Sequence, residues 1–104
     1  MKTTQELMNA IVAPQSAAGY GRKAVTTAGT AVALGTTAPI PSGLVLIKAL
    51  AANTGLIYVG GAAVDNANGF QLSAGDVVYW PATDLADVYI DSAENGEGVC
   101  YVYS

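Results

Sequence analysis

Histidine and cysteine, two residue types that often carry out catalysis, are nearly absent from this chain. It has no histidine, and its single cysteine is Cys100. Without histidine the chain cannot build a Ser-His-Asp or Cys-His nucleophilic site, or a metal site with imidazole ligands. Cys100 has no basic residue near it in the sequence and lies among strand-forming residues. We therefore interpret it as a small, buried apolar residue, and a lone cysteine also excludes a disulfide within the chain.

Three acidic residues that lie close together in the sequence are the next candidates for chemistry. Asp84, Asp87 and Asp91 could pair for acid–base catalysis or bind calcium. Asp87 and Asp91 would share one face of a strand, but the closely spaced ligands and the glycine turn of a calcium loop are missing. We interpret the three carboxylates as part of a solvated or interface surface. The sequence therefore predicts no catalytic residue, no metal site and no cofactor.

Two further patterns are weak functional signals. The segment Gly19-Tyr20-Gly21-Arg22-Lys23 resembles a phosphate-binding loop, but it lacks the preceding strand and the following helix that such loops need. We interpret it as a flexible joint. Aromatic residues late in the chain could stack on a sugar or a nucleobase, for example in a groove lined by Tyr79, Trp80 and Tyr89. Their spacing of two along strands is more typical of a core and an interface.

Composition and charge narrow the class of protein. Hydrophobic residues make up 52% of the 104 residues and charged residues only 12%, which is about half the charge of a typical domain. Such a surface indicates burial against copies of the chain or other partners. Residues 1–48 hold all four basic residues and one acid, whereas residues 49–104 hold seven acids and no base. This pattern does not favour nucleic-acid binding, and no apolar run is long enough to span a membrane.

The first 13 residues fit a short amphipathic helix. Thr3 and Glu6 form a possible capping box, and Pro14 would end the helix. Its apolar face would consist of Leu7, Met8, Ile11 and Val12. A helix this short is unstable alone in water, so the face needs a surface to pack on. That surface is either the rest of this chain or, as we favour, a neighbouring subunit.

The remainder of the chain divides into a linker and a β domain. Residues 14–23 are mostly small and show no periodicity, so we expect an N-terminal arm over residues 1–23 and a β domain over residues 24–104. The spacing of strand and turn signals is typical of an all-β fold, a small antiparallel β-sandwich or barrel of jelly-roll-like form. The expected strands are Ala24–Thr27, Ala31–Leu34, Leu44–Leu50, Leu56–Val59, Phe70–Leu72, Val77–Trp80, Asp87–Ile90 and Val99–Tyr103. The expected core residues are Ile57, Val59, Val78, Val88, Ile90 and Val102.

Four segments of the β domain resemble a known type of protein. They are Gly43–Ala49, Asn53–Gly60 (sequence NTGLIYVG), Gly69–Val78 (GFQLSAGDVV) and Asp84–Ile90 (DLADVYI). Together they are similar to small β-barrel virion proteins of tailed bacteriophages, a group that includes capsid decoration (cement) proteins, head fibres and tail-associated proteins. The likeness lies in turns and strand composition over roughly 60 residues.

The resemblance implies a structural role in a virion. We expect a decoration protein made in the host cytoplasm that binds the major capsid protein on the head surface, as a homo-oligomer and most simply as a trimer. The arm would be the attachment element, with Leu7, Met8, Ile11, Val12, Arg22 and Lys23 at the interface. The resemblance implies no enzymatic activity, no nucleic acid and no membrane. The alternative is a tail- or head-fibre-associated module that recognises a receptor or a glycan.

Overall fold

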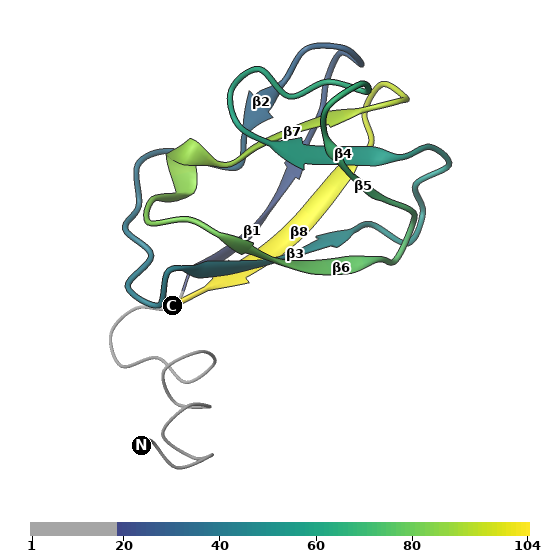
Figure 1. Ribbon diagram of the computed structural model, residues 1–104. Coiled ribbons are helices and arrows are strands. Elements are labelled where there is room, and N and C mark those ends of the chain that lie inside the picture. Colours follow the sequence, from purple (N-terminus) through teal and green to yellow (C-terminus); the bar gives the residue numbers. More distant parts are fainter. Residues whose placement is uncertain (1–18) are drawn as a thin grey trace.

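Eight short strands form where β-branched and aromatic residues are enriched, because these side chains fit a pleated, half-buried surface. The computed structural model describes residues 19–104 (Figure 1). Four strands form a sheet that we call sheet A: β1 (Gly19–Ala24), β8 (Gly98–Tyr103), β3 (Leu44–Ala49) and β6 (Val77–Pro81), in this order. The other four form sheet B: β2 (Val32–Ala33), β7 (Tyr89–Ser92), β4 (Ile57–Gly60) and β5 (Phe70–Leu72).

Every strand pair in the two sheets is antiparallel, and the sheets remain separate. Strands β1 and β6 are the edges of sheet A, and β2 and β5 are the edges of sheet B. The predicted all-β class is therefore confirmed, and the open edges make the domain a sandwich instead of a closed barrel. In the described part of the chain a single 3₁₀ turn, η1 (Leu85–Asp87), precedes β7. No helix within residues 19–104 is long and apolar enough to cross a bilayer.

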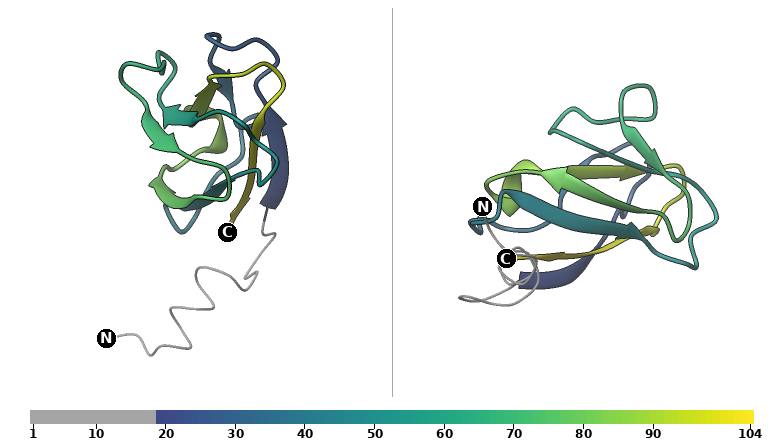
Figure 2. Two further views of the ribbon diagram at one scale, coloured as in Figure 1. Left: turned by 90° about the vertical axis from the view of Figure 1, so that its right-hand side faces the viewer. Right: turned by 60° about the horizontal axis from the view of Figure 1, so that its bottom comes forward.

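The start of the β domain differs from the prediction. The expected amphipathic helix and the first half of the expected linker, residues 14–18, lie outside the described residues. The expected flexible joint, Gly19 to Lys23, is instead strand β1, and the expected strand Ala24–Thr27 does not form beyond Ala24. Strand β1 pairs along its whole length with β8, from Gly19 opposite Tyr103 to Ala24 opposite Gly98. Figure 2 shows that β1 therefore begins beside the C-terminal end of the chain.

Two aromatic rings explain why β1 contains alternating glycines. A Cβ atom at Gly19 would clash with the ring of Tyr103, and one at Gly21 would lie 2.7 Å from the hydroxyl of Tyr101. Both glycines lie directly opposite these tyrosines on β8. The two rings stack with centroids 6.3 Å apart and cover the backbone of β1, as aromatic residues do beside edge glycines. Glycine at these positions therefore stabilises a strand edge and does not mark a hinge.

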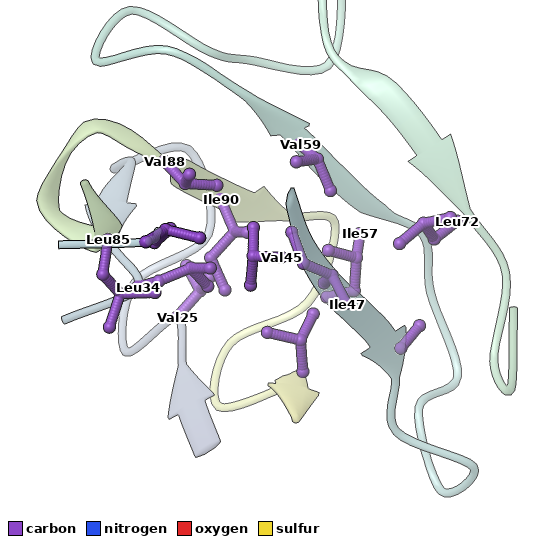
Figure 3. Packing of buried hydrophobic residues seen from close by; sticks show 13 residues of the cluster. Val25, Leu34, Val45, Ile47, Ile57, Val59, Leu72, Leu85, Val88 and Ile90 are labelled. Atoms are coloured by element: carbon purple, nitrogen blue, oxygen red, sulfur yellow. The ribbon is translucent and has the colours of Figure 1, made fainter. Parts of the chain in front are cut away.

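The core lies between the two sheets, and Figure 3 shows side chains from both converging on it. Of the six predicted core residues, Ile57, Val59, Val88 and Ile90 are fully buried. Val78 is half-buried and packs against them. The prediction for Val102 is wrong, because this residue is 42% exposed. In β8 the predicted alternation holds, but Val99, Tyr101 and Tyr103 face the core and Val102 faces outward.

Replacement of Ile90 by alanine is expected to destabilise the fold by about 2–5 kcal/mol, the usual range for a buried aliphatic side chain that leaves a cavity. Ile90 is fully buried in the central strand β7. Chemical denaturation of Ile90→Ala measures the loss. The exposed Val77→Ala serves as the control and is expected to change stability by less than about 1 kcal/mol. Equal losses in the two variants would contradict this position of the core.

A carboxylate connects two loops at one end of the sandwich. Glu97 accepts hydrogen bonds from the backbone N–H of Thr54 at 2.6 Å, the backbone N–H of Gly55 at 2.9 Å and the hydroxyl of Thr54 at 2.9 Å. These hydrogen bonds hold the pKa of Glu97 below its usual value, and the bond from the Thr54 backbone has the largest effect. Burial of the carboxylate acts in the opposite direction and is weaker. The charged carboxylate thus fixes the β3–β4 loop to the turn before β8.

The lowered pKa of Glu97 predicts a loss of stability in acid. A group whose pKa falls on folding contributes stability above its unfolded-state pKa, and that contribution disappears as the pH falls through the folded-state pKa. Glu97→Gln is therefore expected to melt below the wild type at neutral pH, and the two melting curves should converge below the folded-state pKa of Glu97. Thermal melts across this range check the result. A difference that is independent of pH would contradict the role of the charge.

Candidate docking surface

The outward side of sheet A carries two rows of neighbouring side chains, which the strand register defines. The first row crosses the sheet as Tyr20, Val102, Leu46 and Tyr79. The second row crosses as Arg22, Cys100, Lys48 and Val77. We call these eight residues the sheet A outer face. Each is outward because its neighbours in the strand, such as Val45, Ile47 and Val99, are buried in the core.

This face is apolar and exposed. Tyr20 is 84% exposed, Val77 and Tyr79 are each 53% exposed, and Val102 is 42% exposed. They are four of the five large hydrophobic residues found exposed within residues 19–104, and the fifth is Phe70. Single exposed apolar residues need no explanation, but a contiguous group of them marks an interaction site. A shallow hollow of about 220 Å³ lies between Leu46, Val77, Val102 and their neighbours.

The charge on the face has one sign. Arg22 and Lys48 are both exposed, and the four strands of sheet A contain no acidic residue. All seven acids of residues 19–104 lie outside sheet A. No ion pair joins either basic residue to a carboxylate in this part of the chain. The face therefore presents apolar surface with two unneutralised positive charges to whatever covers it.

Of the six predicted interface residues, only Arg22 and Lys23 lie within the described part of the chain. Leu7, Met8, Ile11 and Val12 lie outside the described residues. Arg22 lies on the sheet A outer face, whereas Lys23 is half-buried on the other side of β1. Cys100 is only partly buried on the outer face and is not the fully buried residue that the sequence predicts.

Seven residues of the face were missed as interface residues: Tyr20, Leu46, Lys48, Val77, Tyr79, Cys100 and Val102. The available signal was the run Leu44 to Leu50, apolar on both faces of its strand except at Lys48, which indicates a strand covered on both sides.

The three acidic residues considered for chemistry have separate roles. Asp84 caps η1 and accepts hydrogen bonds from the backbone N–H groups of Ala86 at 2.9 Å and Ala38 at 3.1 Å. Asp87 belongs to η1 instead of β7 and is exposed, whereas Asp91 is 1% exposed. We interpreted the three carboxylates as part of a solvated or interface surface; for Asp91 the solvated alternative is wrong, because the residue is buried. Within residues 19–104, no three acidic or cysteine side chains gather as a metal site would require.

The aromatic groove considered for sugar binding does not form from the expected residues. Tyr79 faces outward from sheet A, and Trp80, its neighbour in β6, packs against the core. Tyr89 belongs to β7 of the other sheet. The ring of Trp80 instead meets that of Phe70 at a centroid distance of 6.1 Å. This contact joins the edge strands β6 and β5 of the two sheets.

Comparison of the chain with protein-family models, with curated proteins and with solved structures finds no match.

Proposed function

We propose that this chain is a bacteriophage virion structural protein, specifically a capsid decoration protein that binds and stabilises the head shell. The sheet A outer face would lie on the shell, together with the N-terminal arm. The observation that carries the proposal is the exposed apolar surface of Tyr20, Val77, Tyr79 and Val102, flanked by Arg22 and Lys48 and free of acids. The resemblance of residues 43–103 to small virion proteins supports it.

The strand order supports a jelly-roll interpretation of the fold. In sheet A β1 pairs with β8 and β3 with β6; in sheet B β2 pairs with β7 and β4 with β5. This is the pattern of one long antiparallel hairpin rolled into two sheets, with β3–β8 and β4–β7 as the contacts that rolling adds. Jelly rolls are common in viral capsid proteins and in lectins. Because a fold alone does not define a function, the surface carries the argument.

The proposed occupant of the face is a capsid surface with acidic groups. Exposed apolar side chains supply the affinity, since burial contributes about 25 cal/mol per Å² of apolar area. Arg22 and Lys48 would pair with capsid carboxylates and fix the orientation. The arm joins the domain at the same sheet, because Gly19 begins β1. Attachment as a homotrimer follows from the resemblance, and sedimentation equilibrium of the full chain tests this oligomeric state.

The contribution of the arm is tested by deletion of residues 1–18. A deletion up to residue 22 would also remove most of β1 and expose the edge of β8, so it would confound attachment with folding. The shorter deletion is expected to leave the melting temperature of the β domain nearly unchanged and to reduce binding to purified shells at least tenfold. Cosedimentation with shells measures this. Full occupancy by the truncated chain would show that the arm is dispensable.

Salt separates apolar from electrostatic attachment. Exposed ion pairs contribute about 0–1 kcal/mol each, and the Debye length falls from about 10 Å at 0.1 M salt to about 3 Å at 1 M. Shell binding is therefore expected to weaken by less than about tenfold over this range, because apolar contacts dominate. Cosedimentation at the two salt concentrations measures the change. Complete release in 1 M salt would make Arg22 and Lys48 the main source of affinity.

A further inference from the structure

A second surface lies on sheet B, on the side away from the core. Two loops fold over this sheet. Val64, in the loop between β4 and β5, packs over Gly60 and Gly69 beside Tyr58. In the loop between β1 and β2, Gly29 donates a backbone hydrogen bond to Asp91. The two loops leave a groove of about 450 Å³ lined by Ala28, Gly29, Tyr58, Asp65, Asn66, Asp91, Ser92 and Ala93.

Asp91 is a buried carboxylate with one oxygen available to the groove. Its side chain is 1% exposed. The Oδ1 atom accepts hydrogen bonds from the backbone N–H of Gly29 at 2.9 Å and of Ser92 at 2.8 Å. The Oδ2 atom has no hydrogen-bond partner within residues 19–104. Since no fully enclosed side-chain oxygen in this part of the chain lacks a partner, Oδ2 keeps some contact with solvent. Asp91 lines the groove, so we infer that this contact is made there. A charge held so deeply is costly unless a partner neutralises it.

Tyr58 places a second unpartnered polar group beside Asp91. The two residues are cross-strand neighbours in β4 and β7, so their Cβ atoms lie about 5 Å apart. Tyr58 is only 7% exposed, and its hydroxyl has no hydrogen-bond partner in the described part of the chain. By the same reasoning the hydroxyl reaches the groove. A fully apolar phenylalanine would fill this position equally well if the hydroxyl had no ligand to meet.

The lining selects a cation with several N–H donors. The polar side chains that line the groove are the two carboxylates of Asp65 and Asp91, one phenol, one amide and one hydroxyl, and none of them is basic. An arginine guanidinium has five N–H donors and no acceptor, which complements these oxygen atoms. Calcium needs six to eight oxygen ligands, and a saccharide usually stacks on an exposed aromatic ring; the ring of Tyr58 is buried. We propose that the groove binds the guanidinium of an arginine side chain carried by a protein ligand.

The test is a titration of the ¹⁵N-labelled full chain with N-acetyl-arginine amide, followed by NMR. The amide protons of Gly29 and Ser92 are direct reporters, because both donate to Asp91. Saturable shifts of these two signals are expected with the arginine compound, and at least tenfold weaker binding with its neutral analogue N-acetyl-citrulline amide. Equal binding of the two compounds would overturn the proposal. So would a response to mannose without one to arginine, which would make the groove a polyol site.

Variants assign the effect to the groove. Asp91→Asn keeps the side-chain shape and an oxygen that can accept the Gly29 and Ser92 bonds, and is expected to weaken arginine binding about tenfold or more, as for a lost charged hydrogen bond. Tyr58→Phe removes only the hydroxyl and should weaken binding severalfold. Asp87→Asn removes an exposed acid outside the lining and should bind as the wild type does. Unchanged binding by both groove variants would overturn the proposal.

The guanidinium could come from a second copy of this chain or from another protein. Arg22 is the single arginine of the sequence, and it is exposed on sheet A, the sheet opposite the groove. If it is the ligand, the Gly29 and Ser92 signals will shift with protein concentration in the wild type and not in Arg22→Gln. Absence of concentration dependence, with retained binding of N-acetyl-arginine amide, assigns the ligand to another protein. The groove and the capsid-binding face are separate, so either proposal can fail alone.

Discussion

A variant with Tyr79→Asp and Val102→Asp is expected to lose about 100-fold or more of its affinity for capsid shells while remaining folded. The two side chains flank Leu46 in one row of the sheet A outer face. Burial of a large apolar side chain contributes about 1.5–3 kcal/mol, and each 1.4 kcal/mol corresponds to tenfold in affinity. The aspartates would also face acidic groups on the capsid. Both positions are about half exposed, so the core stays intact.

A matched variant controls for the added charge. Ala51 and Ala62 are exposed and lie in loops outside sheet A, so Ala51→Asp with Ala62→Asp makes the same change in net charge elsewhere. This control is expected to bind shells like the wild type. Cosedimentation measures binding, and thermal melts establish that both variants are folded. Equal binding by a folded Tyr79/Val102 variant and the control would remove the sheet A outer face from the interface.

Gly98→Ala is expected to be the most damaging single methyl addition in the domain. Gly98 is buried where β8 crosses opposite Ala24 of β1. A Cβ atom there would collide with the backbone carbonyl of Lys23 and lie 2.8 Å from the Cα of Ala24. Because the obstacle is backbone and not a movable side chain, the two strands must separate. We expect a loss of about 3 kcal/mol or more, which lowers the melting temperature by about 12 °C or more in a domain of this size.

Gly61→Ala is the control for this effect. Gly61 is exposed, a Cβ atom there would meet nothing within 4 Å, and its φ angle is not positive. Alanine at this position should therefore be neutral or stabilise slightly through the unfolded state. Differential scanning calorimetry compares the two. Similar melting temperatures for Gly98→Ala and Gly61→Ala would mean that β1 does not pack on β8 as described.

The strand pattern could be predicted because local chemistry dominates there. Leu44–Ala49, Phe70–Leu72 and Val77–Pro81 form strands close to the expected bounds, where β-branched or aromatic residues stand between turn residues. Turns such as that at Gly75 form where glycine supplies a positive φ angle. These signals act over a few residues, and no partner strand is needed to detect them.

Features that depend on distant residues could not be predicted. The glycines of β1 indicate flexibility when viewed alone, and only the tyrosines of β8, about 80 residues later, make them part of a strand. The alternation of side chains in β8 places Val102 and Val99 on opposite faces of the strand, but it does not determine which of these faces packs against the core. That choice depends on packing of the two bulky rings, Tyr101 and Tyr103, over β1.

The candidate sites show the same division. The run Leu44 to Leu50 indicated a strand covered on both sides, but the face needed Tyr20, Tyr79 and Val102 from three other strands. The sequence pattern places Asp91 with Asp87 on one solvated or interface face of a strand. Its actual setting depends on the loop that contains Gly29, 62 residues earlier in the chain. Burial by such a loop leaves no periodic signal in the sequence.

The most direct test of the account is electron cryomicroscopy of purified virions that contain this chain. We expect density for the protein over the whole icosahedral shell, with the sheet A outer face against the major capsid protein and the groove of Tyr58 and Asp91 directed away from it. Density confined to one vertex or to the tail would contradict the decoration role and favour the fibre-associated binding module. Density over the shell with sheet B against the capsid would contradict the assigned docking surface.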